Sequence, residues 1–222
     1  MENPIPLPND SDKDSFQSTY QLAELSVRND PNTCIAIVKP DGLAFIKVSR
    51  ESSILVEKWS SPQIVNINDN MSMSFCGNEA DFRALSGYAK KQSARYQVIH
   101  ESPISSVMIM KELSSALLNQ YTRMVGYRPF AANIVLGARG ILYKIIAGGE
   151  VFHYENNIQV LGDNSEHIEQ LLTRDNVSSL SLDQAIDKCV SILHEVFTLQ
   201  PGDIQVSRTG AEEGSAFTTT VI

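Results

Sequence analysis

The sequence predicts an α+β fold in which two stacked antiparallel sheets are covered by helices on both sides. Strand-like and helix-like segments occur in separate runs along the 222 residues, in the order helix, strands, two helices, strands, two helices. Runs segregated in this way are typical of antiparallel sheets with helical layers outside them. No internal repeat or low-complexity tract interrupts the pattern, which therefore indicates a single domain.

The chain begins with an arm and a short helix. Residues 1–15 are rich in proline, asparagine and aspartate and show no periodicity, which predicts a flexible arm. A helix is predicted from Phe16 to Asn29, because apolar residues recur there at helical spacing. The run Asn29-Asp30-Pro31-Asn32 has the residues of a turn and ends this helix.

Two strand hairpins and two helices follow. The four strands are predicted at Thr33–Lys39, Leu43–Ser49, Gln63–Ile67 and Met71–Cys76. The first hairpin turns at Pro40-Asp41-Gly42, where glycine takes a positive φ at low cost, and the second turns at Asn68-Asp69-Asn70. The two helices each carry an apolar stripe and are predicted at Glu79–Gln97 and Ile104–Thr122.

The second half of the chain again places strands before helices. The strands are predicted at Ala132–Leu136, Ile141–Ile145, Glu150–Tyr154 and Asn157–Val160, and the helices at Ser165–Leu172 and Ser181–Phe197. Ser181 and Gln184 fit a capping box at the start of the last helix. A short strand is predicted at Asp203–Ser207. The domain then covers residues 16–208, and residues 209–222 are predicted to be a loose tail.

Composition excludes several classes of function. The net charge of −8 argues against nucleic acid or an anionic membrane surface as the main partner. The N-terminus does not have the pattern of a secretory signal, and Arg139 and Lys144 interrupt the longest apolar region before it reaches the length of a membrane span. Cys34, Cys76 and Cys189 stand apart among apolar residues, which predicts reduced core thiols. The four histidines lack metal-site spacing, so neither metal nor cofactor is expected.

The most informative stretch is residues 121–137, in which a helix gives way to a strand. Gly126 offers the left-handed conformation that commonly ends a helix. Pro129 disfavours helical backbone at Arg128. The apolar run over residues 130–136 then predicts a strand that is buried on both faces.

This helix-to-strand transition resembles a motif of the α-type subunits of the proteasome core particle. The blocks that match this family, in order, are Phe16-Gln17 with Tyr20, Pro40-Asp41-Gly42, Gly77 with Asp81 and Arg83, Glu101-Ser102-Pro103-Ile104, and Tyr121 through Arg128, Pro129 and Phe130. The link between the two central helices, the Tyr121 block and the C-terminal stretch are most similar to the second of the seven eukaryotic α-type subunits. The resemblance implies a four-layer αββα sandwich of the N-terminal-nucleophile hydrolase class.

The resemblance also implies that this chain is not an enzyme. In the catalytic β-type relatives, a threonine at the processed chain start attacks the substrate, with its own amine as base and a lysine and an aspartate as helpers. A register anchored on Gly42 places Thr33 at the nucleophile position, but a helix-bearing segment precedes it. The aspartate and lysine positions fall at Val48 and Gln63, which cannot assist proton transfer.

Two other hypotheses remain open at the level of the sequence. A self-processing threonine peptidase or amidase of the same fold would use Thr33 as its nucleophile after cleavage behind Asn32. A free-standing binding module would have the same fold but act outside any ring. The first residue of the mature chain and the mass of the native particle distinguish these cases.

Assembly is the function that the resemblance implies. In this family, seven related α-type subunits form a ring that templates the β-type rings and binds regulatory caps. The resulting particle would degrade proteins in the cytoplasm and nucleus. Residues 1–15 would lie at the substrate-entry pore. The following helix would pack against neighbouring subunits, beginning with Phe16, Gln17 and Tyr20.

Two departures from the family pattern bear on gating and regulation. The Tyr-Asp-Arg gate motif corresponds here to Glu2-Asn3-Pro4, and the turn before the helix reads Asp10-Ser11-Asp12-Lys13, which leaves open whether this arm closes the pore. Gln63 stands where the family places a lysine that pairs with the C-terminal carboxylate of an activator. A neutral amide loses about half the strength of that charge-assisted hydrogen bond. We therefore expect weak activator binding at this pocket.

Overall fold

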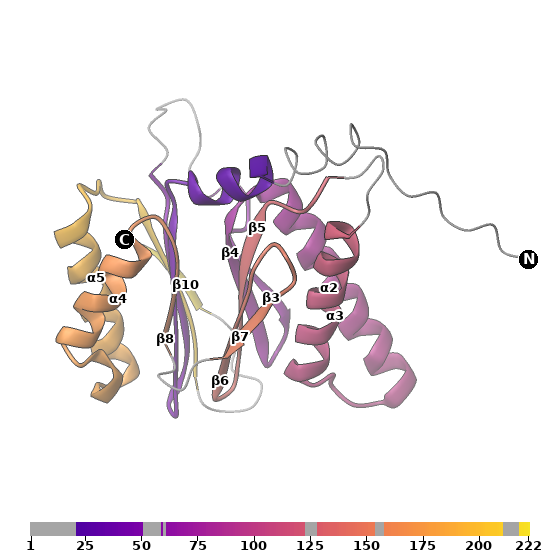
Figure 1. Cartoon of the computed structure of the whole chain (residues 1–222). Helices are drawn as coiled ribbons and strands as arrows, with labels where there is room; N and C mark the ends of the chain where they lie inside the picture. Colours follow the sequence, from indigo (N-terminus) through magenta and orange to yellow (C-terminus); the bar gives the residue numbers. More distant parts are fainter. Residues whose placement is uncertain (1–20, 51–58, 60, 123–127, 154–157, 211–217) are drawn as a thin grey trace, which may run out of the picture.

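The computed structural model describes residues 21–50, 59, 61–122, 128–153, 158–210 and 218–222, which form a four-layer sandwich (Figure 1). Two antiparallel sheets are its inner layers. The first sheet contains β1 (Thr33–Lys39), β2 (Gly42–Val48), β8 (Ile158–Gly162), β9 (Ile204–Gly210) and β10 (Thr218–Val221), in the order β10-β9-β2-β1-β8. The second contains β3 (Ile64–Asn68), β4 (Met71–Gly77), β5 (Ala132–Ala138), β6 (Ile141–Ile145) and β7 (Val151–His153), in the order β3-β4-β5-β6-β7.

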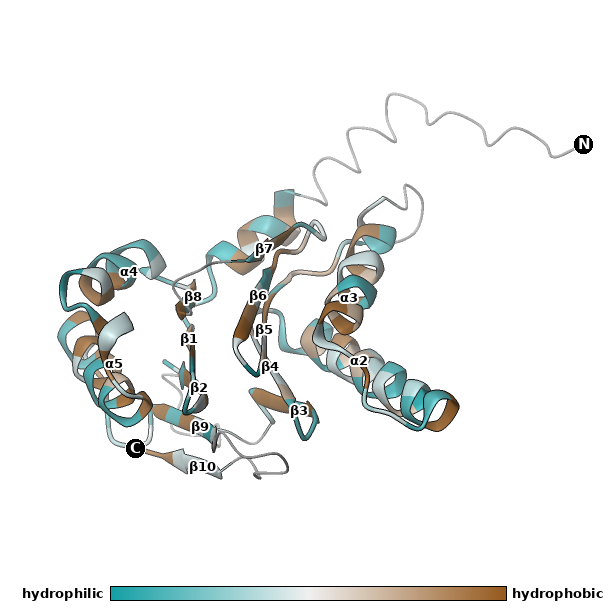
Figure 2. Ribbon diagram, turned by 90° about the horizontal axis from the view of Figure 1, so that it is seen from below, coloured by the Kyte–Doolittle hydropathy of each residue, from teal (hydrophilic) through white to brown (hydrophobic). Residues whose placement is uncertain are grey.

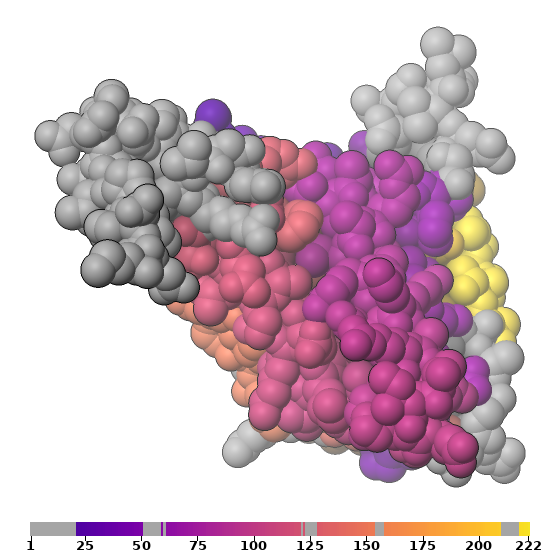
Figure 3. Space-filling model, turned by 90° about the vertical axis from the view of Figure 1, so that its right-hand side faces the viewer, coloured from indigo at the N-terminus to yellow at the C-terminus, as the bar shows by residue number. Residues whose placement is uncertain are grey.

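A pair of helices covers the outer face of each sheet. The first sheet is covered by α4 (Ser165–Arg174) and α5 (Leu182–Val196), and the second by α2 (Glu79–His100) and α3 (Ser106–Tyr121). Figure 2 shows the four layers edge-on, and Figure 3 shows α2 and α3 side by side on one outer surface. This architecture confirms the predicted α+β fold with an αββα order of layers.

Three apolar clusters fill the spaces between the layers. Alternate residues of β1 face opposite ways: Cys34 and Ala36 face the second sheet, whereas Ile35 and Ile37 pack toward α4 and α5. Every residue of β1 is therefore buried, which explains why its sequence is almost continuously apolar rather than alternating. The remaining cluster joins the second sheet to α2 and α3.

The ends of the helices follow the capping residues of the sequence. Asn78 precedes α2, and its side chain accepts a hydrogen bond from the Asp81 main-chain N–H at 3.2 Å. The predicted capping box of Ser181 and Gln184 is confirmed at the start of α5. Among the described residues, no helix has both the length and the apolar character needed to cross a bilayer.

Among the differences from the predicted helices, the end of α2 and the segment between α4 and α5 have a clear physical reason. The sequence predicts that the first long helix ends at Gln97, but α2 continues to His100 and stops where Glu101 takes a left-handed conformation with φ 51°. No glycine or proline stands in these extra residues to end the helix earlier. A 3-10 turn, η1 (Val177–Ser179), joins α4 to α5 and was not predicted, because so short a turn produces no periodic pattern.

The C-terminal segment requires a correction. The sequence predicts a loose tail over residues 209–222, whereas β9 continues to Gly210 and β10 pairs with it, Thr218 opposite Arg208 and Val221 opposite Gln205. The β-branched side chains of β10 favour an extended backbone. All four residues of this edge strand are exposed, so no alternation of apolar and polar residues marks it in the sequence.

Candidate functional site at the start of the first strand

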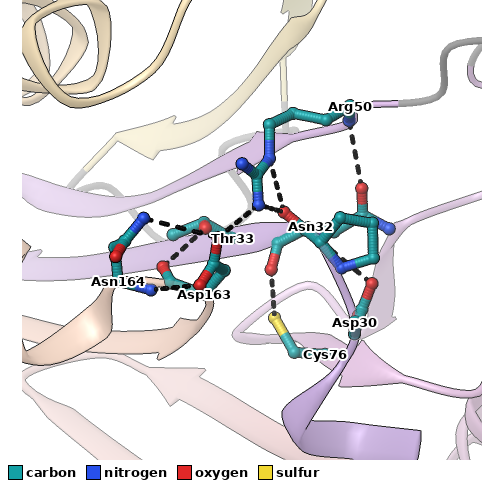
Figure 4. A network of polar contacts seen from close by, with 8 residues as sticks. Asp30, Asn32, Thr33, Arg50, Cys76, Asp163 and Asn164 are labelled. Carbon is teal, nitrogen blue, oxygen red and sulfur yellow. Dashed lines mark hydrogen bonds and ion pairs between the residues drawn. The ribbon is translucent and has the colours of Figure 1, made fainter.

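The candidate site is the end of the sandwich where β1 begins. Thr33 is the first residue of β1, and it pairs with Val48 of β2 on one side and Gly162 of β8 on the other. Its side chain is fully buried, and its hydroxyl donates a hydrogen bond to the main-chain carbonyl of Asp163 at 3.0 Å (Figure 4). The hydroxyl is therefore already bonded and is not exposed to a substrate.

The peptide bond in front of Thr33 is also held in place. The Asn32 N–H donates to the Asp30 carboxylate at 3.1 Å. The Asn32 carbonyl accepts a hydrogen bond from the Asp163 N–H at 3.4 Å and contacts the Cys76 thiol at 3.7 Å. In this intact chain, the nitrogen of Thr33 is consequently an amide inside a bonded junction and not a free amine.

The two positions at which the sequence places the helper residues do not converge on the hydroxyl. Val48 lies opposite Thr33 and packs in the apolar cluster under α4 and α5. Gln63 lies just before β3, where its side-chain amide donates to the Glu79 carboxylate at 3.3 Å. The side chain of Gln63 is thus engaged at the start of α2.

A buried lysine that the sequence analysis did not single out lies nearby. Lys47 is fully buried, its Nζ donates to the main-chain carbonyl of Phe75, and this nitrogen lies 3.7 Å from the Cys76 sulfur and 4.4 Å from the centre of the Phe75 ring. Because Lys47 pairs with Cys34, its side chain points between the sheets, on the face of the first sheet opposite to that of Thr33. The sequence did carry a signal for this residue, because Lys47 is the one charged residue in the otherwise apolar strand of residues 42–48.

Substitution of Lys47 separates packing from polarity. We expect Lys47→Met to leave the unfolding free energy unchanged or to raise it by about 1 kcal/mol, since a well-packed apolar side chain replaces a buried polar one. Lys47→Ala should lower it by about 2–4 kcal/mol through the cavity that it leaves. Urea unfolding followed by the fluorescence of Trp59, the single tryptophan, measures both. A loss of several kcal/mol in Lys47→Met would show that the amino group itself is required.

An N-terminal helix covers this end of the sandwich. Residues 21–28 are helical, which agrees with the part of the predicted helix that the structure describes. Ala23 and Val27 pack on Ala131, and Figure 1 shows the helix lying across the ends of both sheets. A pocket of about 270 Å³ remains between this helix, the turn after β6 and the start of α4, and Thr33 is not among the described residues that line it.

Polar contacts tie the linker between this helix and β1 to both sheets. The Asp30 carboxylate accepts the Gly77 N–H at 2.6 Å, at the end of β4. Arg50 donates to the Pro31 carbonyl at 2.7 Å and to the Asp163 carboxylate at 2.6 Å, and its guanidinium lies 4.4 Å from the centre of the Phe197 ring. Figure 4 shows how these residues converge from separate elements.

The three thiols are free and buried. Burial raises the pKa of Cys76 to about 12, despite the nearby amine of Lys47, and burial also raises the pKa of Cys189 to about 12. Both groups therefore remain neutral thiols near pH 7, which makes them poor nucleophiles. Within the described ranges, no three or more His, Cys, Asp or Glu side chains gather as metal ligands would.

A second group of predicted residues meets between the start of α2 and the segment that leads into β5. Arg128 donates to both carboxylate oxygens of Asp81, at 2.6 and 2.7 Å, and the Ala131 N–H donates to the same carboxylate at 2.8 Å. The hydrogen bonding to the Asp81 carboxylate raises the pKa of the Arg128 guanidinium. Gly77 adjoins the same junction, whereas the Arg83 side chain is exposed on α2 and takes no part in it.

The remaining predicted residues are placed as follows. Pro129 is buried, Phe130 packs against the cluster under α2 and α3, and Tyr121 is the last residue of α3. The predicted arm and ring-packing residues lie outside the described residues, as does Gly126; they are Glu2, Asn3, Pro4, Asp10, Asp12, Phe16, Gln17 and Tyr20.

Two stacked antiparallel sheets between helical layers, with a threonine opening the first strand, define the N-terminal-nucleophile hydrolase class of fold. The family model described as "Proteasome subunit" matches residues 29–207. This chain therefore belongs to the proteasome subunit family.

Several curated relatives are similar to this chain over most of their length. Proteasome subunit alpha type-2-A of Arabidopsis thaliana is 24% identical over 187 residues, which cover 82% of this chain and 78% of the relative. Proteasome subunit alpha type-2 of Drosophila melanogaster is 24% identical, with 82% and 76% covered. Proteasome subunit alpha 1 of Haloferax volcanii is 26% identical, with 80% and 72% covered. The chain is thus a divergent α-type member that resembles the type-2 subunits.

Proposed function

We propose that this chain is a non-catalytic subunit of the α ring of a proteasome core particle, packed beside other α-type subunits and on the β-type ring. The junction in front of Thr33 carries the proposal. The hydroxyl donates to the Asp163 carbonyl, the Thr33 nitrogen is an amide, and the N-terminal helix lies across this end of the sandwich. The helper positions hold a buried valine and a glutamine bonded to Glu79. A threonine hydroxyl without a base is not an activated nucleophile.

The state of the chain inside its native particle tests this proposal. Intact-mass measurement should find the Asn32–Thr33 bond uncut, and native mass spectrometry should find the chain in a particle many times its own 24.5 kDa. A covalent inhibitor of threonine peptidases should label only other subunits. A chain that starts at Thr33, or carries the inhibitor there, would establish the self-processing enzyme instead, and a free monomer would establish the binding module.

The outer face of the N-terminal helix supports its role in packing against a neighbouring subunit. Leu22 and Leu25 are 65% and 47% exposed, while Ala23 and Val27 of the same helix are buried. Large apolar side chains on the free face of a short helix are typical of an interaction surface. We expect the double change Leu22→Glu and Leu25→Glu to prevent co-purification with the other α-type subunits without lowering the unfolding free energy of the isolated chain. Val221→Glu, on β10, is the matched exposed control.

The contact between Gln63 and Glu79 sharpens the proposal that this pocket binds activator tails weakly. The Gln63 amide donates to the Glu79 carboxylate at 3.3 Å. A C-terminal carboxylate that approaches Gln63 is therefore repelled by the negative charge of Glu79. The residue therefore lacks the positive charge of a lysine and also has an acidic neighbour. We infer that other pockets of the ring provide the main activator contacts.

Restoring the positive charge tests this inference. We expect Gln63→Lys to raise activator affinity by about threefold and Gln63→Lys with Glu79→Gln by about tenfold, because Glu79 pairs with the new lysine in the single variant. Activator-stimulated peptide hydrolysis by reconstituted particles measures both. Glu79→Gln alone is the control. Equal stimulation in all four particles would remove Gln63 from the activator pocket.

We further propose that residues 1–15 lie on the pore side of the ring and that the particle acts in the cytoplasm and nucleus. The absence of the Tyr-Asp-Arg motif supports a limited part for this arm in closing the pore. Deletion of residues 2–12 in the assembled particle should therefore leave basal peptide hydrolysis within about twofold of wild type, because this arm carries Glu2-Asn3-Pro4 in place of the gate motif. A large rise in basal hydrolysis would assign the gate to this arm.

A further inference from the structure

Apolar contacts alone hold the described part of the N-terminal helix weakly. Among residues 21–28, only Ala23 and Val27 are buried, and both side chains are small. The described stretch spans about two turns, and so short a stretch is marginal in water without tertiary support. Contacts outside this small cluster therefore help to direct the helix across the sandwich.

The linker that follows the helix supplies those contacts. Asp30 fixes one point of the linker to the second sheet, through the Gly77 N–H at 2.6 Å. Arg50 fixes the next two points to the first sheet: its side chain donates to the Pro31 carbonyl at 2.7 Å, and its main-chain N–H donates to the Asn32 side chain at 3.1 Å. Because three successive linker residues are attached to the two sheets, both the position of the linker and the direction in which it runs are fixed.

Arg50 is itself held on two further sides. Its guanidinium pairs with the Asp163 carboxylate at 2.6 Å and lies over the Phe197 ring. Its side chain is 27% exposed, so the ion pair is only partly screened by solvent. The planar guanidinium presents several N–H groups in a fixed fork, which allows one side chain to join the Pro31 carbonyl to Asp163.

We propose that Asp30, Arg50 and Asp163 form a polar latch that sets the direction in which the N-terminal helix leaves the sandwich. Arg50 and Asp163 are positioning residues: they do not belong to the exposed face of the helix but determine where Leu22 and Leu25 are presented. The effect on ring assembly rests on the proposed function. The latch itself is a property of the single chain.

Hydrogen exchange of the full isolated chain tests the latch. In Arg50→Ala and Asp163→Asn, amides of residues 21–32 should exchange about tenfold faster than in wild type. Arg50→Ala removes the charge-assisted hydrogen bond to the Pro31 carbonyl, and Asp163→Asn removes the ion pair that holds Arg50 in place. Asp163→Asn retains the main-chain carbonyl that accepts from Thr33. Arg208→Ala, which breaks an exposed ion pair between β9 of the same sheet and Asp183 of α5, is the matched control and should leave these amides unchanged.

Two further readouts separate positioning from general stability. The urea midpoint of global unfolding and the exchange of α2 amides should stay at wild-type values, and the variants should enter reconstituted rings less efficiently than wild type in direct competition. Unchanged exchange over residues 21–32 would overturn the latch. Equal acceleration across the whole chain, with a lower midpoint, would also overturn it in favour of a merely structural role. If wild type itself enters no ring, the proposed function fails, and the exchange data alone decide the latch.

Discussion

Gly77→Ala should prevent stable folding of the isolated chain or lower its unfolding free energy by more than about 3 kcal/mol. Gly77 has φ 118°, which side-chain-bearing residues rarely adopt. A Cβ there would lie 2.3 Å from the Ala131 carbonyl oxygen and 3.1 Å from a methyl group of Val27. The first clash is with backbone at the entry to β5, which cannot move without disturbing the second sheet.

A glycine of α2 provides the control for this experiment. Gly87 is exposed in the interior of the helix, and a Cβ at that position would meet nothing within 4 Å. Gly87→Ala should therefore stabilise the chain by about 0.5–1 kcal/mol, because alanine is the better helix former. Urea unfolding of both variants gives the comparison. A Gly77→Ala protein as stable as wild type would show that the Ala131 junction yields easily.

Asp81→Ala is the second change with a large expected effect. The Asp81 side chain is 7% exposed, and its carboxylate accepts three hydrogen bonds, two from Arg128 and one from the buried Ala131 N–H. Its removal leaves this N–H without its partner and frees the loop that leads into β5. We expect the unfolding free energy to fall by about 3 kcal/mol. Arg128→Ala should cost less, because that side chain is 54% exposed and water replaces part of the pair.

The matched control for Asp81→Ala is Arg83→Ala on the same helix. The Arg83 side chain is exposed, so its removal should change stability by no more than about 0.5 kcal/mol. Combining Asp81→Ala with Arg128→Ala should cost little more than Asp81→Ala alone, since the two residues share one interaction. Strictly additive losses would mean that the pair does not act as a unit.

Both predictions concern residues from two of the sequence blocks that match the family, the Gly77 block and the block that contains Arg128. The pattern indicated Gly77, Asp81 and Arg128 through a family resemblance, but it did not say what they do. The structure shows that they meet at Ala131. The Asp81 carboxylate bonds both Arg128 and the Ala131 N–H, and Gly77 lies against the Ala131 carbonyl, so together they hold the backbone that leads into β5. Arg83 belongs to the same sequence block and remains apart, because its position on α2 faces solvent.

The sequence by itself determined the order of helices and strands and the α+β class, because periodicity and capping depend on residues close together in the chain. It also placed Thr33 at the start of its strand, with Val48 and Gln63 at the helper positions. Only the tertiary structure decided that Lys47 and Thr33 lie on opposite faces of one sheet, that Arg50 latches the linker to Asp163, and that β10 is a strand. The Thr33–Asp163 and Arg50–Asp163 contacts join residues 130 and 113 positions apart. Such partners are chosen by how the sheets stack, and no local pattern encodes that choice.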